Sequence, residues 1–189
     1  MSTAFEGGRL QIGGLAWLSA QQYRLPASGV ITTPMPSCGA VPMAAVDPRR
    51  ILVPMHDGDG VWFGITALAD TVLRVRGAIA SARHGWLDIV SGSSWASLAR
   101  AGALAVPPAT ALDGIPHDGG GMWPLTRHAV QACAPSCRRL HLYLDGSGTA
   151  DEARVALYFV RPATYRRLTG ADPGQAADPG HQFGKYLLA

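Results

Sequence analysis

The clearest alternation of apolar and polar positions lies in two runs, residues 139–144 and 154–159. In both runs every second residue is apolar: Leu140, Leu142, Leu144, Val155, Leu157 and Phe159. The intervening residues are mostly polar or aromatic: Arg139, His141, Tyr143, Arg154, Ala156 and Tyr158. A period of two residues puts the two sets on opposite faces of a strand. The pattern therefore predicts a β-hairpin with one buried and one polar face, turning at Asp145-Gly146-Ser147-Gly148-Thr149.

Shorter apolar runs predict further strands. Runs 51–53 and 61–65 flank a glycine-rich turn, which is typical of a β-hairpin. From about Thr71, apolar residues alternate with Arg74 and Arg76, which predicts a strand after a helical turn that starts near Thr66. Residues 86–90 are expected to form another short strand.

Four segments carry helix signals. Leu15 and Leu18 share one helical face in segment 15–23, and Ser94 is placed to cap a helix over 94–101. Pro124 favours the first position of a helix over 124–133. Segment 162–168 begins with Pro162 and is followed by Gly170, which is the usual order of these residues at helix ends.

These elements predict an α+β fold in a single domain of residues 1–189. It would hold a mainly antiparallel, twisted sheet and three or four short helices. The 23 glycines and 14 prolines argue against an all-helical bundle. Residues 1–50 are expected to be rich in loops, 171–180 to be a surface loop, and 181–189 to add a strand-like edge. Charged residues make up only 15% of the chain, so we expect part of the surface to be covered in a homo-oligomer.

Charge and hydropathy limit the classes of partner that we expect for this chain. The net charge is +3, and all basic side chains except Lys185 are arginines, several of which occur in pairs such as Arg138-Arg139 and Arg166-Arg167. Nucleic-acid binding would require these pairs to gather on one face, so we do not expect it. No apolar run approaches the roughly 18 residues that span a membrane, and the first residues lack a signal-peptide layout. We therefore expect a soluble, cytoplasmic protein that does not bind membranes.

One phrase, His-Asp-Gly-x-Gly-x-Trp, occurs twice, at residues 56–62 and 117–123. The phrase predicts a polar turn, whose glycines permit a tight backbone, followed by an aromatic residue. Two explanations stay open: a duplicated half-domain, or two loops that converge on one site.

The two turns hold the candidate catalytic residues His56, Asp57, His117 and Asp118, and the first also holds Asp59. If the loops met, the imidazoles and carboxylates would form an acid–base pair or bind a divalent metal. Otherwise each turn is local and its histidine caps a backbone group. Because no metal-site or cofactor motif is complete, we expect neither a metal nor a cofactor.

Trp62 and Trp123 follow the two turns and are candidate aromatic platforms for a sugar or a flat ligand. The alternative is that both pack in the core. Cys38, Cys133 and Cys137 do not form a disulfide framework, and we expect buried structural thiols; a cysteine nucleophile assisted by His128 or His141 is the alternative.

The polar face of the predicted hairpin is the remaining candidate. Its ligand-binding residues are Arg139, His141, Tyr143, Arg154 and Tyr158. The sequence thus favours a non-catalytic binding protein that recognises a small polar or aromatic ligand, or a protein partner, through this face and the two turns. The alternatives are a hydrolase or lyase that uses His56 and His117, and a homodimer interface built from the two loops.

Overall fold

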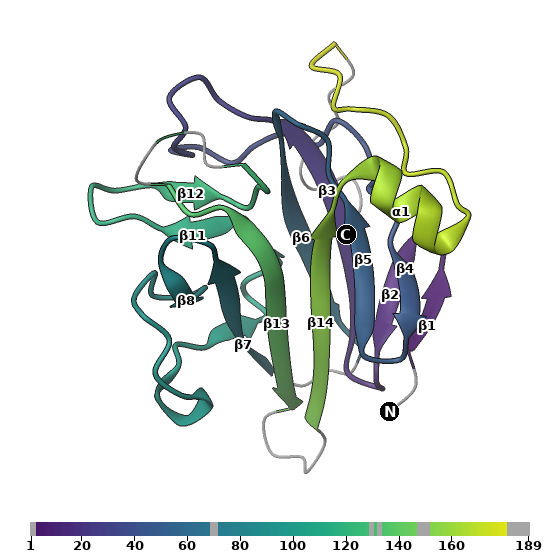
Figure 1. The fold of residues 1–189 in the computed structure, drawn as a ribbon. Coiled ribbons are helices and arrows are strands. Elements are labelled where there is room, and N and C mark those ends of the chain that lie inside the picture. The colour runs from purple at the N-terminus through teal and green to yellow at the C-terminus, as the bar shows by residue number, and fades with distance from the viewer. Residues whose placement is uncertain (1–2, 69–71, 129–130, 132–133, 147–151, 181–189) are drawn as a thin grey trace.

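The computed structural model describes residues 3–68, 72–128, 131, 134–146 and 152–180, and most of its regular structure is β (Figure 1). Its strands are β1 (Thr3–Glu6), β2 (Arg9–Ile12), β3 (Ala16–Arg24), β4 (Ala44–Asp47), β5 (Arg50–Pro54), β6 (Asp59–Ala67), β7 (Leu73–Ser81), β8 (Gly85–Asp88), β9 (Leu104–Val106), β10 (Ala111–Leu112), β11 (Gly114–Pro116), β12 (Met122–Pro124), β13 (Cys137–Gly146) and β14 (Glu152–Val160). They form a five-stranded sheet, a seven-stranded sheet and a pair, β11–β12.

The five-stranded sheet has the order β1-β2-β3-β6-β10, and its neighbouring strands are antiparallel. Its centre is the pair β3–β6, which is in register from Ala16 opposite Ala67 to Arg24 opposite Asp59. The seven-stranded sheet has the order β4-β5-β14-β13-β7-β8, with β9 also paired to β7. Its neighbours are antiparallel except for β5 and β14, which run parallel.

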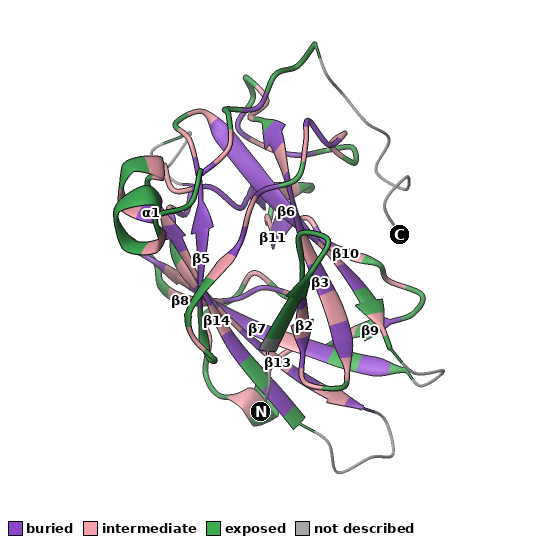
Figure 2. Cartoon of the chain, turned by 90° about the vertical axis from the view of Figure 1, so that its right-hand side faces the viewer, coloured by how far each residue is buried: buried purple, intermediate pink, exposed green. Residues whose placement is uncertain are grey.

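The two sheets pack face to face around one apolar core. Phe63 of β6 and Phe159 of β14 meet there, with ring centroids 6.2 Å apart. Leu140, Leu142 and Leu144 of β13 are buried in the same core. Buried positions alternate with more exposed ones along the strands (Figure 2). The predicted hairpin over 139–159 is confirmed, since β13 and β14 pair with Leu142 opposite Val155.

The helix α1 (Pro162–Thr169) is the one predicted helix that is confirmed. Pro162 occupies its first turn, and Gly170 ends it in the left-handed conformation with φ 70°. Tyr165 is buried, and the helix packs against β4 and β5 (Figure 1). The main contacts of α1 are thus with β4 and β5, at one edge of the sheet, rather than with β14, β13, β7 and β8.

The predicted α+β class with three or four helices is wrong. In the described part of the chain, regular helix is limited to α1 and a 3-10 turn, Leu98–Arg100. Segment 15–23, expected to be helical, lies almost wholly in β3. Its buried residues Ala16, Leu18 and Ala20 follow a period of two, and pairing with β2 and β6 on both sides overrides the weak helical spacing.

The two other helix predictions are also wrong for similar reasons. Ser94 extends the edge of β8 through a bridge to Leu87, so segment 94–101 begins as extended chain. Pro124 ends strand β12, and Leu125 bridges to Val61 of β6. Residues 129, 133, 147–149 and 181–189, which carried parts of the helix, turn and tail predictions, lie outside the described residues.

The predicted hairpin of segments 51–53 and 61–65 has the correct strands but the wrong pairing. β5 pairs with β4 and β14, whereas β6 pairs with β3 and β10. The first His-Asp-Gly turn therefore carries the chain from one sheet to the other. The strand expected from about Thr71 is confirmed as β7, and that expected over 86–90 corresponds to β8.

Candidate functional site

The outer face of the seven-stranded sheet gathers the polar residues predicted from the hairpin pattern. Because Leu140, Leu142 and Leu144 point into the core, Arg139, His141 and Tyr143 point outward and are half-buried. We call the following set the aromatic–arginine face: Trp86, Trp95, Arg139, His141, Tyr143, Arg154 and Tyr158.

Arg139 lies in a row that crosses four strands. The pairing puts Tyr158 of β14 opposite Arg139 on one side and Ala80 of β7 on the other, and Ala80 is opposite Trp86 of β8. The small side chain of Ala80 leaves Arg139 free to reach Trp86. Its guanidinium carbon lies 4.9 Å from the centroid of Trp86 and 5.7 Å from that of Tyr158. Arg139 is thus held between two aromatic rings.

His141 lies at the centre of the face, with Ala156 and Ala78 opposite it on the neighbouring strands. Its ring centroid is 5.0 Å from that of Trp86 and 6.4 Å from that of Tyr143. Burial among these rings, and then the charge of Arg139, lower the pKa of His141 below its ordinary value. Its imidazole is therefore neutral at neutral pH and offers one donor and one acceptor.

Tyr143 connects the sheet to the loop that follows β8. Trp95 stacks on Tyr143 at a centroid distance of 6.0 Å and an interplanar angle of 14°. Arg154 lies over Tyr143 at 5.5 Å. The sequence interpretation missed Trp86 and Trp95 as members of this face. The position of Trp86 on a predicted strand was a usable signal, but its neighbour across the sheet depends on long-range pairing.

The loop that carries Trp95 is held by a buried carboxylate. Asp88 accepts hydrogen bonds from the backbone N–H groups of Val90 at 2.7 Å, Ser91 at 3.1 Å and Gly102 at 2.8 Å. The backbone N–H of Trp95 also donates to the carbonyl of Trp86 at 2.8 Å. These bonds fix the indole of Trp95 over the sheet.

The arginines of the sheet differ in their counter-charges. Arg74 and Arg76 both pair with Asp145, the former at 2.6 Å, and Arg154 lies 3.7 Å from Glu152. Arg139 contacts no carboxylate in the described part of the chain. Its N–H groups are therefore the charged donors of this face that an anion can bind without displacing an acidic residue.

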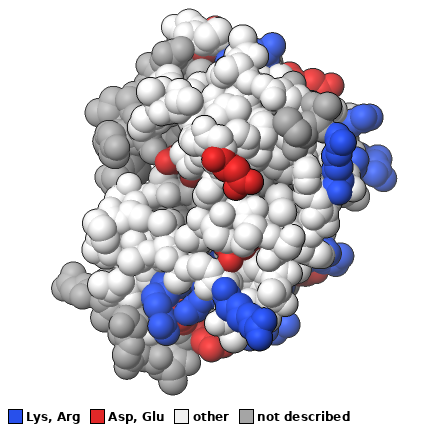
Figure 3. Space-filling view, turned by 90° about the vertical axis from the view of Figure 1, so that its left-hand side faces the viewer, with Lys and Arg blue, Asp and Glu red and all other residues white. Residues whose placement is uncertain are grey.

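Figure 3 shows the side of the molecule at the left of Figure 1, where basic side chains form separate groups with acidic ones between them. A nucleic-acid groove requires a continuous basic stripe. This side does not present one.

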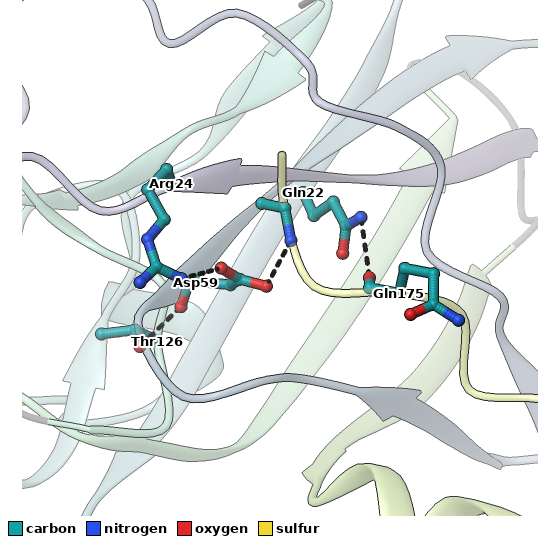
Figure 4. A network of polar contacts seen from close by, with 6 residues as sticks. Gln22, Arg24, Asp59, Thr126 and Gln175 are labelled. Carbon is teal, nitrogen blue, oxygen red and sulfur yellow. Dashed lines mark hydrogen bonds and ion pairs between the residues drawn. The ribbon is translucent and has the colours of Figure 1, made fainter. Parts of the chain in front are cut away.

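The first His-Asp-Gly turn binds the segment that follows α1 (Figure 4). Asp59 is 1% exposed and accepts hydrogen bonds from Arg24 at 3.1 Å and from the backbone N–H of Ala177 at 2.8 Å. His56 Nε2 lies 3.1 Å from the carbonyl oxygen of Gly174, to which it donates. The turn is thus a docking point for the chain around residues 174–177, and Asp59 is its central residue.

Asp57 and the second turn make separate contacts. Asp57 is exposed and its carboxylate lies 2.6 Å from Nε2 of His128. In the second turn, the His117 ring packs edge-on against Trp123 at 4.3 Å, and its Nδ1 accepts from the backbone N–H of Gly119 at 3.1 Å. Asp118 is exposed.

The structure brings the apolar ends of the two phrases near each other, since Met122 packs against the cluster that contains Trp62, but it does not join their polar residues. The antiparallel bridge between Val61 and Leu125 makes the chain before Val61 run beside the chain after Leu125. Asp57 accordingly meets His128, whereas the chain from Leu125 back to His117 leaves in the opposite direction. Among the described residues no hydrogen bond, ion pair or ring contact joins one turn to the other.

The predicted tryptophan platforms are buried. Trp62 packs with Tyr23 and Ile31 in a small second cluster, and Trp123 belongs to the main core. Neither is placed on the aromatic–arginine face.

The remaining candidates from the sequence are the cysteines and the residues that could bind a metal. Cys137 is completely buried, and this burial raises the pKa of its thiol to about 12. Cys38 is also buried and free, and Cys133 lies outside the described residues. Among the described residues, no three histidine, cysteine or acidic side chains lie close enough to hold a metal ion.

No protein-family model, curated protein or solved structure matches this chain. Within the part of the chain that the structure describes, none of the helices has the length and apolar character to cross a membrane.

Proposed function

We propose that this protein is a non-catalytic binding protein and that the aromatic–arginine face recognises a small anion carrying a flat ring. The observation that supports this proposal most is the position of Arg139 between Trp86 and Tyr158 without a carboxylate partner. An arginine stacked in this way keeps its donors at the edge of the guanidinium plane, where they match the two oxygens of a carboxylate.

The rings next to Arg139 supply the second part of the recognition. Half-buried Trp86 and Tyr143 offer apolar surface for a flat ligand, and the neutral imidazole of His141 lies between them. The face thus offers a cation for the anionic group, apolar surface for the flat ring, and one imidazole that can donate and accept a hydrogen bond. In its described residues it holds no hydroxyl or thiol paired with a base, which is why we favour binding over the hydrolase or lyase alternative.

Calorimetric titration with 4-hydroxybenzoate tests the proposal, because this probe combines a flat ring with a carboxylate. Acetate and phenol serve as probes that each lack one feature. We expect 4-hydroxybenzoate to bind more tightly than either one, and Arg139→Gln to weaken its binding by about tenfold, which corresponds to one charge-assisted pair.

Arg167→Gln is the matched control, since Arg167 is an exposed arginine on α1, which packs mainly against β4 and β5 and contributes no residue to this face. It should leave the affinity unchanged. Equal binding by wild type and Arg139→Gln, or binding of acetate as tight as that of 4-hydroxybenzoate, would contradict the proposal.

A further inference from the structure

Three arginines gather where β13 begins and β14 ends. The backbone N–H of Cys137 donates to the carbonyl of Thr126 at 2.7 Å, which brings Arg138 beside Arg127. Arg127 in turn donates from Nη1 to the carbonyl of Phe159 at 3.2 Å, two residues before Arg161. We call Arg127, Arg138 and Arg161 the arginine cluster.

A β-bulge sets the direction of Arg138. The pairing of β13 with β7 shifts register between Cys137, opposite Ser81, and Arg139, opposite Ala80. Arg138 is therefore the extra residue, and it is exposed although Cys137 points into the core and Arg139 onto the outer face. Bulges redirect a side chain in this way, often beside a functional site.

No ion pair neutralises the cluster among the described residues. Six other arginines of the described chain pair with acidic residues: Arg24, Arg50, Arg74, Arg76, Arg154 and Arg166. None of the three arginines in the cluster does so among the described residues, and Asp57 nearby is in contact with His128. Burial is the main cause that lowers the pKa of Arg127; the charges of Arg161 and Arg138 lower it further, and the carboxylate of Asp57 opposes them in part.

Two sets of hydrogen-bond donors at the cluster are available to a ligand. Nε of Arg127 is buried and has no hydrogen-bond partner in the described part of the chain. Arg161 is the N-cap of α1, where no side chain caps the helix and no acidic residue lies in the first turn. The first N–H groups of a helix attract an anion; Pro162 has none, so here the N–H groups of Ala163 and Thr164 add to the three guanidinium groups.

We propose that the arginine cluster is a binding site for a phosphate group, either inorganic phosphate or a phosphate monoester. A phosphate carries close to two negative charges at neutral pH and several acceptor oxygens, so it can neutralise the cluster and take bonds from more than one guanidinium. A carboxylate offers a single charge and two oxygens. The two proposed sites use different arginines, because Arg139 lies between Trp86 and Tyr158, whereas Arg138, the bulge residue, belongs to the arginine cluster.

Calorimetry and thermal unfolding with two probes, inorganic phosphate and glucose 6-phosphate, test this site against sodium chloride of the same ionic strength. We expect at least one probe to bind and raise the melting temperature. A preference for glucose 6-phosphate identifies a monoester as the ligand, and equal or tighter binding of inorganic phosphate identifies the free ion. Arg138→Gln and Arg161→Gln should each weaken binding by about tenfold.

These two variants are suited to the test because both arginines are exposed and their side chains make no hydrogen bond or ion pair with a described residue. Arg167→Gln, on the same helix, and Arg139→Gln, next to Arg138 in the chain, should bind phosphate as the wild type does. Arg138→Gln should in turn keep its affinity for 4-hydroxybenzoate. Absence of binding by both probes, or binding that persists in the Arg138→Gln/Arg161→Gln double variant, would overturn the proposal.

Discussion

The buried carboxylate of Asp59 accepts a hydrogen bond at 2.8 Å from the backbone N–H of Ala177, 118 residues further along the chain. Arg24 donates to the other oxygen of the same carboxylate at 3.1 Å, and Gln22 donates to the carbonyl of Gln175 at 3.1 Å. Main-chain atoms of Gln175 and Ala177 are therefore bound by side chains of β3 and of the start of β6 (Figure 4).

Replacing Asp59 with asparagine tests this fastening. Asparagine replaces one of the two carboxylate oxygens with an NH2 group, so either the backbone N–H of Ala177 or the half-exposed guanidinium of Arg24 loses its acceptor. We expect the free energy of unfolding to fall by about 1–3 kcal/mol. Hydrogen exchange should also show faster exchange of the Ala177 amide.

Asp172→Asn is the control for this experiment. Asp172 lies in the same segment but is exposed, and its bond to the backbone N–H of Gly174 can be kept by an asparagine. It should change the free energy of unfolding by less than about 0.5 kcal/mol. An unchanged exchange rate of the Ala177 amide in Asp59→Asn would show that the carboxylate does not hold the segment.

His141 gives a prediction about pH. Its pKa is lowered in the folded state, mainly by burial and then by Arg139, so the unfolded chain takes up a proton first as the pH falls. Stability should therefore decrease as the pH falls below about 6.5, the ordinary histidine value, and level off below the folded pKa. Urea unfolding of the wild type and His141→Gln between pH 4.5 and 7.5, about the range of a histidine titration, measures the difference.

Titration of the His141 ring by NMR checks the cause of this shift. Arg139→Gln should raise the pKa of His141 only in part, because burial is the larger effect. An ordinary pKa in the wild type would contradict the prediction, as would a pH dependence of stability that is the same in His141→Gln.

The two His-Asp-Gly turns show why the sequence could identify some of the site and not the rest. In the first copy Gly58 has φ 85°, whereas in the second the positive values belong to Gly120 at 89° and Gly121 at 76°. Gly60 serves yet another purpose, because a Cβ there would lie 2.4 Å from Cζ of Tyr23. The glycines of the two copies therefore differ in backbone conformation and in packing, so the repeat did not predict one shared structure.

Local patterns were informative where one strand decides the outcome. The alternation in β13 predicted which of its side chains point outward, and Pro162 with Gly170 predicted α1. The pairing of β5 with β14 joins residues about a hundred positions apart, as in Leu157 opposite Ile51, and no local pattern encodes it. The same holds for Trp86, which reaches Arg139 only through the order of β8, β7 and β13.

Cys137 should be unreactive in the folded protein. Its thiol is completely buried and its pKa is raised to about 12, so the thiolate is scarce at pH 8 and sheltered from solvent. We expect iodoacetamide to leave Cys137 unmodified in the native protein and to modify it in urea, as followed by peptide mass spectrometry. Rapid modification at pH 8 in the native protein would contradict this and would favour the cysteine-nucleophile alternative.

The loop that follows β8 and carries Trp95 gives the last prediction. Asp88 holds the backbone of this loop with two carboxylate oxygens, one bound to Val90 and Ser91 and the other to Gly102. Asp88→Asn loses one of these acceptors and should cost about 1 kcal/mol, whereas Asp88→Ala loses both and should cost about 1–3 kcal/mol. Hydrogen exchange at Gly102 and urea unfolding measure the two effects.

The same graded loss should reach the proposed ligand surface, because Asp88 fixes the loop that places Trp95 on Tyr143. We expect 4-hydroxybenzoate to bind more weakly to Asp88→Ala than to Asp88→Asn. Ser91→Ala, whose hydroxyl contacts the exposed Ser93, should retain the wild-type affinity. If Asp88→Ala unfolds more easily yet binds as the wild type does, Asp88 supports the fold alone, and Trp95 does not belong to the recognition surface.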